Sequence, residues 1–162
     1  MGLGYGVRVK SETPCAQLTR FIDHRQLKRS MTGHTKTVRC LGFVDPGTAI
    51  SASSDTTVKI WDLESGACES TFSGHTSTIR ALAFTKDLAI SGDGDGTCLV
   101  WSLPQHRRIA TLTGHSAAIY SIAFDGQRIF TGSADQDVRV WDTTKETYVF
   151  VMKTHASLVS HV

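Results

Sequence analysis

The sequence predicts an all-β fold, and three observations carry this prediction. A repeat of 40 to 41 residues runs through the 162-residue chain, with the pair Gly-His beginning at Gly33, Gly74 and Gly114. Between these markers lie short β-rich runs such as TVRCLGF, TAISAS and TVKIW, separated by the turn-forming segments SSDTT, DGDGT and ADQDV. Helical periodicity is absent from the sequence.

Each repeat is expected to form a four-stranded antiparallel meander. The first strand of a unit is almost continuously apolar, which predicts burial on both faces, whereas the later strands alternate more clearly. The units begin near residues 33, 74 and 114, and an incomplete unit that supplies one innermost strand begins near 154. Residues 27–32 are expected to form the outermost strand of a preceding unit, and residues 1–26 an irregular N-terminal extension.

Composition excludes several classes of partner and site. The formal net charge is +2, which is too weak a bias to favour nucleic acid or a membrane surface. The longest apolar runs are short and interrupted, so no segment is long enough to span a bilayer, and MGLGYGVRVK lacks the apolar region of a signal peptide. The four cysteines lack the spacing of a metal site or a disulfide framework, so we expect reduced thiols in a cytoplasmic or nuclear protein.

Three further residue types recur in every unit. A Ser or Thr is followed four residues later by Asp, and Trp comes six residues after that Asp. This pattern resembles the WD-repeat family of β-propellers, in which four-stranded blades surround a central channel. The resemblance covers residues 33–153 and implies a partial WD-repeat β-propeller with three complete four-stranded blades plus edge strands.

The resemblance also implies a hydrogen-bond relay within each blade. In it, Asp holds His, His meets the Ser or Thr hydroxyl, and that hydroxyl meets the Trp indole N–H, which satisfies polar groups that burial would otherwise leave unpaired. The relay residues expected from the family are His34, Ser51, Asp55 and Trp61; His75, Ser91, Asp95 and Trp101; and His115, Thr131, Asp135 and Trp141.

The repeated Ser, His and Asp do not predict an enzyme. A hydrolase needs one such constellation with an exposed nucleophile, not one beside a Trp in every repeat. The three repeated His lie about forty residues apart in different blades, which does not fit a metal site. We therefore expect no catalytic residues, no metal and no cofactor.

Three blades leave a propeller open, because a ring has typically 4 to 8 blades. The expected edges at residues 27–32 and 154–162 lack the middle strands of a blade, so closure between the chain ends is not expected. Two explanations remain open: the chain is a fragment whose remaining blades lie elsewhere, or other copies of the chain complete the ring. In either case the isolated chain is expected to be oligomeric or prone to aggregate.

The family resemblance places a candidate binding site at the channel mouth. The residue five positions after each His is Arg39, Arg80 or Tyr120, and two arginines near one axis favour an acidic or phosphorylated ligand. The units resemble F-box/WD-repeat proteins, the substrate receptors of cullin-RING ubiquitin ligases, which implies phosphodegron recognition through Thr37, Arg39, Arg80 and Tyr120. In a structural alternative, each Arg lies along the channel wall with a hydrated head group.

Two departures from the F-box/WD-repeat pattern limit what it implies. The residue before the turn Asp, often Arg or Tyr in that family, is Ser54, Gly94 or Ala134 here, which predicts a shallower and less basic pocket. Residues 1–26 are too short for an F-box. The alternatives are a general scaffold subunit that binds through blade faces or rim, and an RNA-binding blade set whose affinity would depend on salt.

Overall fold

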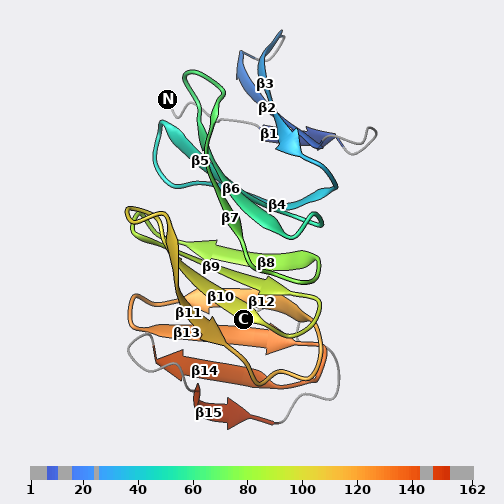
Figure 1. Cartoon of the computed structure of the whole chain (residues 1–162), viewed down its shortest axis with the longest axis vertical. Helices are drawn as coiled ribbons and strands as arrows, with labels where there is room; N and C mark the ends of the chain where they lie inside the picture. Colours follow the sequence, from blue (N-terminus) through green and yellow to red (C-terminus); the bar gives the residue numbers. More distant parts are fainter. Residues whose placement is uncertain (1–6, 11–15, 24–25, 143–147, 154–162) are drawn as a thin grey trace.

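The structure, a computed structural model, describes residues 7–10, 16–23, 26–142 and 148–153, and these form four antiparallel sheets arranged one after another along the long axis (Figure 1). None of the described residues forms a helix long and apolar enough for a membrane crossing. Three sheets have four strands each, in sequence order, so the fold is all-β and each repeat is the expected meander.

The first sheet corrects two expectations about the N-terminal region. Its strands, in the order β1-β2-β3, are β1 (Val7–Lys10), β2 (Ala16–Asp23) and β3 (Gln26–His34). Residues 7–10 and 16–23 therefore form strands and are not irregular. The edge strand expected at residues 27–32 was predicted to lack neighbouring strands, but in the structure β2 pairs with β3 and β1 pairs with β2. The repeat markers are absent from this segment, but VRVK alternates apolar and charged residues as a half-buried strand does.

The three blades repeat one pattern of strands. The first contains β4 (Val38–Phe43), β5 (Thr48–Ser53), β6 (Thr57–Asp62) and β7 (Cys68–Ser73). The second contains β8 (Ile79–Phe84), β9 (Leu88–Asp93), β10 (Cys98–Ser102) and β11 (Arg107–Leu112). The third contains β12 (Ile119–Phe124), β13 (Arg128–Ser133), β14 (Val138–Asp142) and β15 (Tyr148–Met152). The expected innermost strand at 154–162 lies outside the described residues.

In each blade the second strand is more buried than the first. Five of the six residues of β5 and of β9 are buried, whereas most of β4, β8 and β12 is half-buried or exposed. The expectation that the first strand is buried on both faces is therefore wrong. These innermost strands lie side by side, and Cys40 Sγ of β4 donates a hydrogen bond to the Arg80 carbonyl of β8 at 3.3 Å. Apolar residues of these strands, such as Ile79 of β8 and Ile119 of β12, pack in clusters that span neighbouring blades.

Neighbouring sheets are joined by apolar contacts. The Phe72 ring of β7 lies 5.3 Å from the Trp101 ring of the next blade, measured between centroids. The Phe84 ring of β8 covers Gly42 of β4 so closely that a Cβ on that glycine would lie 2.1 Å from the ring. Apolar burial of this kind stabilises by about 25 cal/mol per Å², so the stacking of sheets supplies much of the fold's stability.

Candidate functional site

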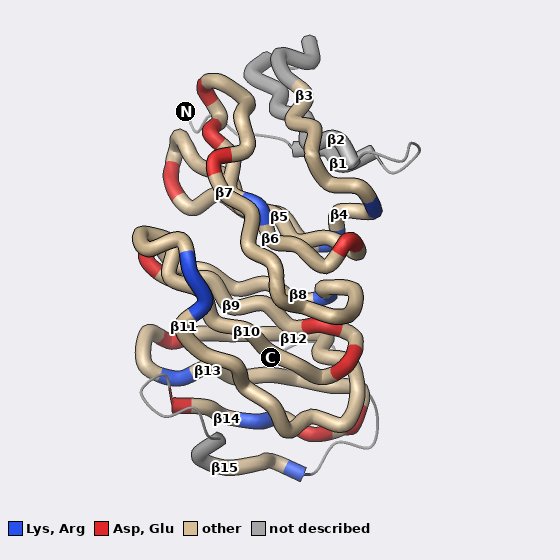
Figure 2. Tube along the Cα trace, in the orientation of Figure 1, with Lys and Arg blue, Asp and Glu red and all other residues tan. Residues whose placement is uncertain are grey.

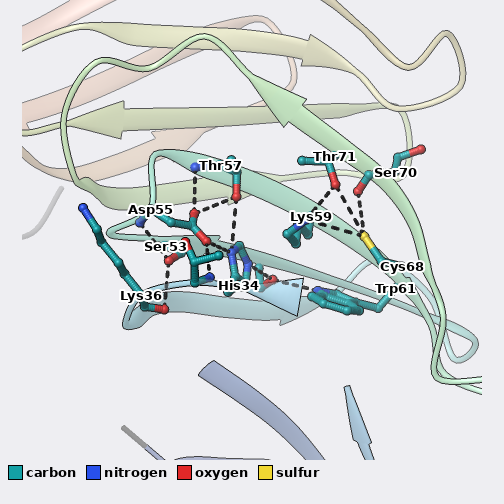
Figure 3. Close-up of polar contacts among 12 residues, drawn as sticks. His34, Lys36, Ser53, Asp55, Thr57, Lys59, Trp61, Cys68, Ser70 and Thr71 are labelled. Atoms are coloured by element: carbon teal, nitrogen blue, oxygen red, sulfur yellow. Dashed lines mark hydrogen bonds and ion pairs between the residues drawn. The ribbon is translucent and has the colours of Figure 1, made fainter. Parts of the chain in front are cut away.

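The first-blade relay contains the four residues expected from the sequence, and Figure 3 shows three of them, His34, Asp55 and Trp61. His34 Nδ1 lies 2.8 Å from Asp55 Oδ2, and His34 Nε2 lies 2.8 Å from Ser51 Oγ. The Trp61 indole N–H donates to the same Ser51 oxygen at 2.7 Å. His34, Ser51 and Trp61 are buried, so this chain of bonds satisfies polar groups that water does not reach.

The charge state of the relay follows from its surroundings. Burial lowers the pKa of His34 below 6.5, even though Asp55 favours the charged ring. Burial would raise the pKa of Asp55, but hydrogen bonds from Thr57, the Thr35 N–H and His34 outweigh it and lower that pKa to about 2. A neutral His34 beside an ionised Asp55 must carry its proton on Nδ1, so the Ser51 hydroxyl donates to Nε2.

The second blade corrects the predicted relay. Asp93, not Asp95, lies against the histidine: its Oδ2 is 2.7 Å from His75 Nδ1. Ser91 Oγ lies 2.7 Å from His75 Nε2 and accepts the Trp101 N–H at 2.7 Å, as expected. Asp95 is exposed and accepts a bond from the Thr76 hydroxyl at 3.2 Å.

Side-chain length and additional hydrogen bonds explain why Asp93 takes the place of Asp95 in the second relay. The first and third units carry Ser53 and Ser133 at the position of Asp93, and these short side chains donate to backbone carbonyls. The longer Asp93 reaches His75, and its other oxygen accepts the N–H groups of Asp95 and Thr97, both at 3.0 Å. Burial opposes ionisation, but these bonds, with that from His75 the strongest, lower the pKa of Asp93.

The third relay again contains the expected residues. His115 Nδ1 lies 2.8 Å from Asp135 Oδ2, His115 Nε2 lies 2.8 Å from Thr131 Oγ1, and the Trp141 N–H donates to Thr131 Oγ1 at 2.8 Å. Burial lowers the pKa of His115, as it does for His34. The first and third relays therefore hold neutral histidines inside the blades, where His34 and His115 fix the turns.

A β-bulge places each predicted mouth residue. The pairing of first and second strands shifts register between Val38 and Cys40, between Ile79 and Ala81, and between Ile119 and Ser121. The residue that is skipped in each case is Arg39, Arg80 or Tyr120. A bulge adds an unpaired residue and re-aims its side chain, and bulges are frequent beside functional sites. Sequence spacing located these three residues but not the bulges that position them.

In each blade, one backbone hydrogen bond joins the residue just before the first strand to the residue just after the second strand. The Ser54 N–H donates to the Thr37 carbonyl at 2.8 Å, and Gly94 and Ala134 make the same bond to Thr78 and Ala118. Thr37 itself is exposed immediately before β4. The residue before the turn Asp therefore lies beside the mouth in every blade. We define the mouth cluster as Thr37, Arg39, Ser54, Ser77, Arg80, Gly94 and Tyr120.

Contacts within the mouth cluster differ between blades. The guanidinium carbon of Arg80 lies 5.2 Å from the centre of the Tyr120 ring, which is within cation–π range. Arg39 is exposed, and its Nε donates to Ser54 Oγ of its own blade at 3.2 Å. The structure thus brings Arg80 and Tyr120 together, whereas Arg39 contacts neither of them within the described part of the chain.

Arg80 retains hydrogen-bonding capacity. Its Nε is buried and has no partner among the described residues, which is costly for a charged group unless a ligand completes it. Gly94 packs close to this atom: a Cβ there would lie 3.6 Å from Arg80 Nε and would clash with Ser77 Oγ at 2.7 Å. Arg80 is therefore the residue of the mouth cluster with an unused charged donor among the described residues.

Charge elsewhere on the molecule is mixed. Figure 2 shows most acidic residues in the loops and turns at strand ends, whereas basic residues also lie within β11 and β14. Two of these, Arg107 and Arg108, lie in the outermost strand of the second blade and are exposed. Among the described residues both signs of charge are therefore interspersed, and recognition at the mouth cluster depends on local contacts.

The chain resembles proteins built from the same repeat. A family model described as "WD domain, G-beta repeat" matches residues 25–62, 66–102 and 106–142. Among solved structures, the computationally designed Ika8 protein is 27% identical, with a TM-score of 0.80 over 96% of this chain and 51% of that one. U3-55K is 26% identical, with a TM-score of 0.76 over 82% of this chain and 44% of that one. The chain thus spans about half the length of these proteins.

Proposed function

Because the chain belongs to the WD-repeat family, whose members are in general non-catalytic protein-interaction modules, we propose that its mouth cluster recognises an acidic or phosphorylated segment of a partner protein. We further propose that this recognition selects substrates for an F-box-type ubiquitin ligase in the cytoplasm or nucleus. The wording of the repeat units, which resembles that of F-box/WD-repeat receptors, supports the second step.

One observation carries the proposal: Arg80 Nε is buried and has no hydrogen-bond partner among the described residues. A phosphate oxygen that reaches the Arg80 guanidinium accepts a charge-assisted hydrogen bond from it. The cation–π contact with Tyr120 holds the guanidinium in place before binding, so less side-chain freedom is lost when the ligand arrives.

The test compares binding of matched peptide libraries. Degenerate phosphoserine and phosphothreonine peptides are applied to the 162-residue chain, beside the same sequences without phosphate. We expect selected phosphopeptides to bind and their unphosphorylated forms to bind at least 10-fold more weakly, since a bond to a charged group contributes roughly 1.5–3 kcal/mol. Equal binding of both forms would contradict phosphate recognition and favour the general scaffold function.

Two variants locate the bound group. Arg80→Ala removes the unpartnered nitrogen and is expected to weaken phosphopeptide binding about 10-fold or more. The matched control is Arg107→Ala, which removes an exposed arginine from β11 and should leave binding unchanged. A third variant, Gly94→Ala, places a methyl group beside Ser77 Oγ and should also weaken binding. Equal losses in the Arg80 and Arg107 variants would show that binding depends on net charge alone.

The ligase step has its own test. In cells, the protein in its natural length is expected to co-purify with cullin-RING subunits, and a bound substrate is expected to be longer-lived when Arg80 is changed to Ala. Retention of phosphopeptide binding without any association with ligase subunits would remove the ubiquitin-ligase assignment and leave phosphate recognition standing.

A further inference from the structure

The second blade has a carboxylate that its relay does not use. In the first and third blades the turn aspartate bonds the histidine, and the side chains of Asp55 and Asp135 are only 6% and 7% exposed. In the second blade Asp93 takes that place, and its side chain is 0% exposed. Asp95 is exposed, so the second blade presents a carboxylate to solvent at the position that the other two blades bury.

Asp95 lies directly beside the mouth cluster. Its neighbour Gly94 belongs to that cluster and donates its N–H to the Thr78 carbonyl at 3.0 Å. A Cβ on Gly94 would lie 2.7 Å from Ser77 Oγ and 3.6 Å from Arg80 Nε, so Gly94 is in contact with both side chains. Consecutive Cα atoms are about 3.8 Å apart, so the backbone of Asp95 is one residue away from the contact with Arg80.

The Asp95 carboxylate and the Arg80 guanidinium remain separate charges. Asp95 Oδ2 accepts a hydrogen bond from the exposed Thr76 hydroxyl at 3.2 Å. No ion pair joins Asp95 to Arg80 within the part of the chain that the structure describes. A negative and a positive group therefore flank the contact between Gly94 and Ser77, and neither neutralises the other.

The turn that carries Asp95 is fixed before any ligand binds. Asp93 Oδ1 accepts the N–H groups of Asp95 and Thr97, both at 3.0 Å. Gly96 packs against the third blade, where a Cβ on it would lie 2.6 Å from the His115 carbonyl oxygen. Since a group on an ordered turn loses little freedom on binding, Asp95 can discriminate between ligands at low entropic cost.

We propose that Asp95 selects ligands in which a lysine or arginine lies within one or two residues of the acidic or phosphorylated group that Arg80 binds. This selectivity rests on the proposed function of the mouth cluster. An extended peptide advances about 3.3–3.6 Å per residue, so adjacent side chains of one segment reach both charges. The phosphorylated residue then faces Arg80 and the basic residue faces Asp95.

The same carboxylate rejects other segments. A peptide with acidic residues on both sides of the phosphorylated residue brings a like charge against Asp95, which is unfavourable. Specificity arises from the difference between the attracted and the repelled ligand, so one exposed carboxylate contributes to it twice. The preferred ligand is thus a segment of mixed charge and not a uniformly acidic one.

The first test varies the peptide. One phosphoserine peptide that binds the 162-residue chain is prepared with Lys, Ala or Glu at each of the two positions on either side of the phosphoserine. At one or more positions, we expect Lys to bind about 2- to 5-fold more tightly than Ala, the range of a solvent-exposed ion pair, and Glu to bind more weakly than Ala. Fluorescence polarisation measures the affinities.

The second test varies the protein. Asp95→Asn should remove the difference between the Lys and Glu peptides, and Asp95→Lys should reverse it. Asp87→Asn is the matched control, because Asp87 is also exposed but lies in the turn before β9, at the opposite end of that strand from Asp93. This control changes the net charge by the same amount and should keep the preference of the wild-type chain.

The outcomes separate the selectivity from the proposed function. Phosphate-dependent binding with equal affinity for Lys and Glu peptides, or a preference that persists in Asp95→Asn, would refute the role of Asp95 and leave phosphate recognition standing. Binding that does not depend on phosphate would overturn both. Where the variants do not fold, the wild-type chain decides: its preference for Lys should shrink as ionic strength rises, and a preference that salt does not change would contradict an ion pair.

Discussion

Asp93 and Asp95 exchange roles at the turn of the second blade. The spacing rule of the repeat places the relay carboxylate six residues before Trp, which is where Asp95 lies. In the folded blade, hydrogen-bond reach decides, and the buried Asp93 at the end of β9 takes the histidine. The spacing rule selects Asp95, and it cannot show that the side chain of Asp93, two positions earlier, reaches His75 in the folded blade.

Because Asp93 and not Asp95 bonds the histidine, substitutions at these two positions should differ strongly in their effect on the free energy of unfolding. Asp93→Asn removes the charge that accepts from His75 and two N–H groups, so we expect the free energy of unfolding to fall by about 1–3 kcal/mol. Asp95→Asn alters an exposed bond and should cost under about 0.5 kcal/mol. Urea denaturation followed by tryptophan fluorescence measures both, and a larger loss from Asp95→Asn would refute the assignment.

The buried histidines predict that stability falls in acid. The pKa values of His34 and His115 are lowered in the folded state, so below pH 6.5 the unfolded chain binds more protons and the free energy of unfolding decreases. The pKa of Asp55 is about 2 in the fold against 3.8 unfolded, which adds a second loss as pH falls below about 4.

Urea denaturation at several pH values between 7.5 and 3 tests this dependence. The Asp55→Asn variant lacks the carboxyl that titrates and should show a shallower loss between pH 4 and 3 than the wild-type chain. Constant stability from pH 7.5 to 5.5 would contradict the assignment of neutral, buried histidines.

At the scale of the element, the turn between second and third strands requires a left-handed residue. Thr56 and Gln136 both have φ of 71°, and Gly96 fills the same position at 84°. A β-branched residue in this conformation is strained. Glycine is required in the second blade for another reason, since a Cβ on Gly96 would lie 2.6 Å from the His115 carbonyl oxygen.

Substitutions at these two turns should therefore have opposite signs. Thr56→Gly relieves the strain and is expected to raise the free energy of unfolding by roughly 0.5–1 kcal/mol, after the entropy cost of glycine. Gly96→Ala adds both strain and a clash and should lower it by about 1–3 kcal/mol. Thermal denaturation monitored by circular dichroism measures both, and destabilisation by Thr56→Gly would contradict the account.

Strands were predictable where the repeat markers repeat, and less so elsewhere. The meanders of the three blades follow from turn residues and β-rich runs between Gly-His and Trp. The strands β1 and β2 lack both markers, so only their short alternating runs could have indicated them. Apolar content also overstated the burial of the first strands, because most residues of β4, β8 and β12 are half-buried or exposed.

At the scale of the whole molecule, the chain is part of a propeller, and the candidate site is built from three successive blades. The three innermost strands lie in sequence order, and a bulge in each presents Arg39, Arg80 or Tyr120 at the same level. The sequence could locate these residues through the repeat period. It could not show that Arg80 pairs with Tyr120 while Arg39 bonds Ser54, because side-chain partners across blades depend on packing.

The central claim is that these arginines act on one acidic ligand at the mouth. A double-mutant cycle tests it most directly, with the affinity of one selected phosphopeptide measured for the wild-type chain, Arg39→Ala, Arg80→Ala and the double variant. We predict that each single change weakens binding about 10-fold or more and that their combined effect departs from the sum of the two, as expected for residues sharing one ligand. Unchanged affinity in both single variants would contradict the claim.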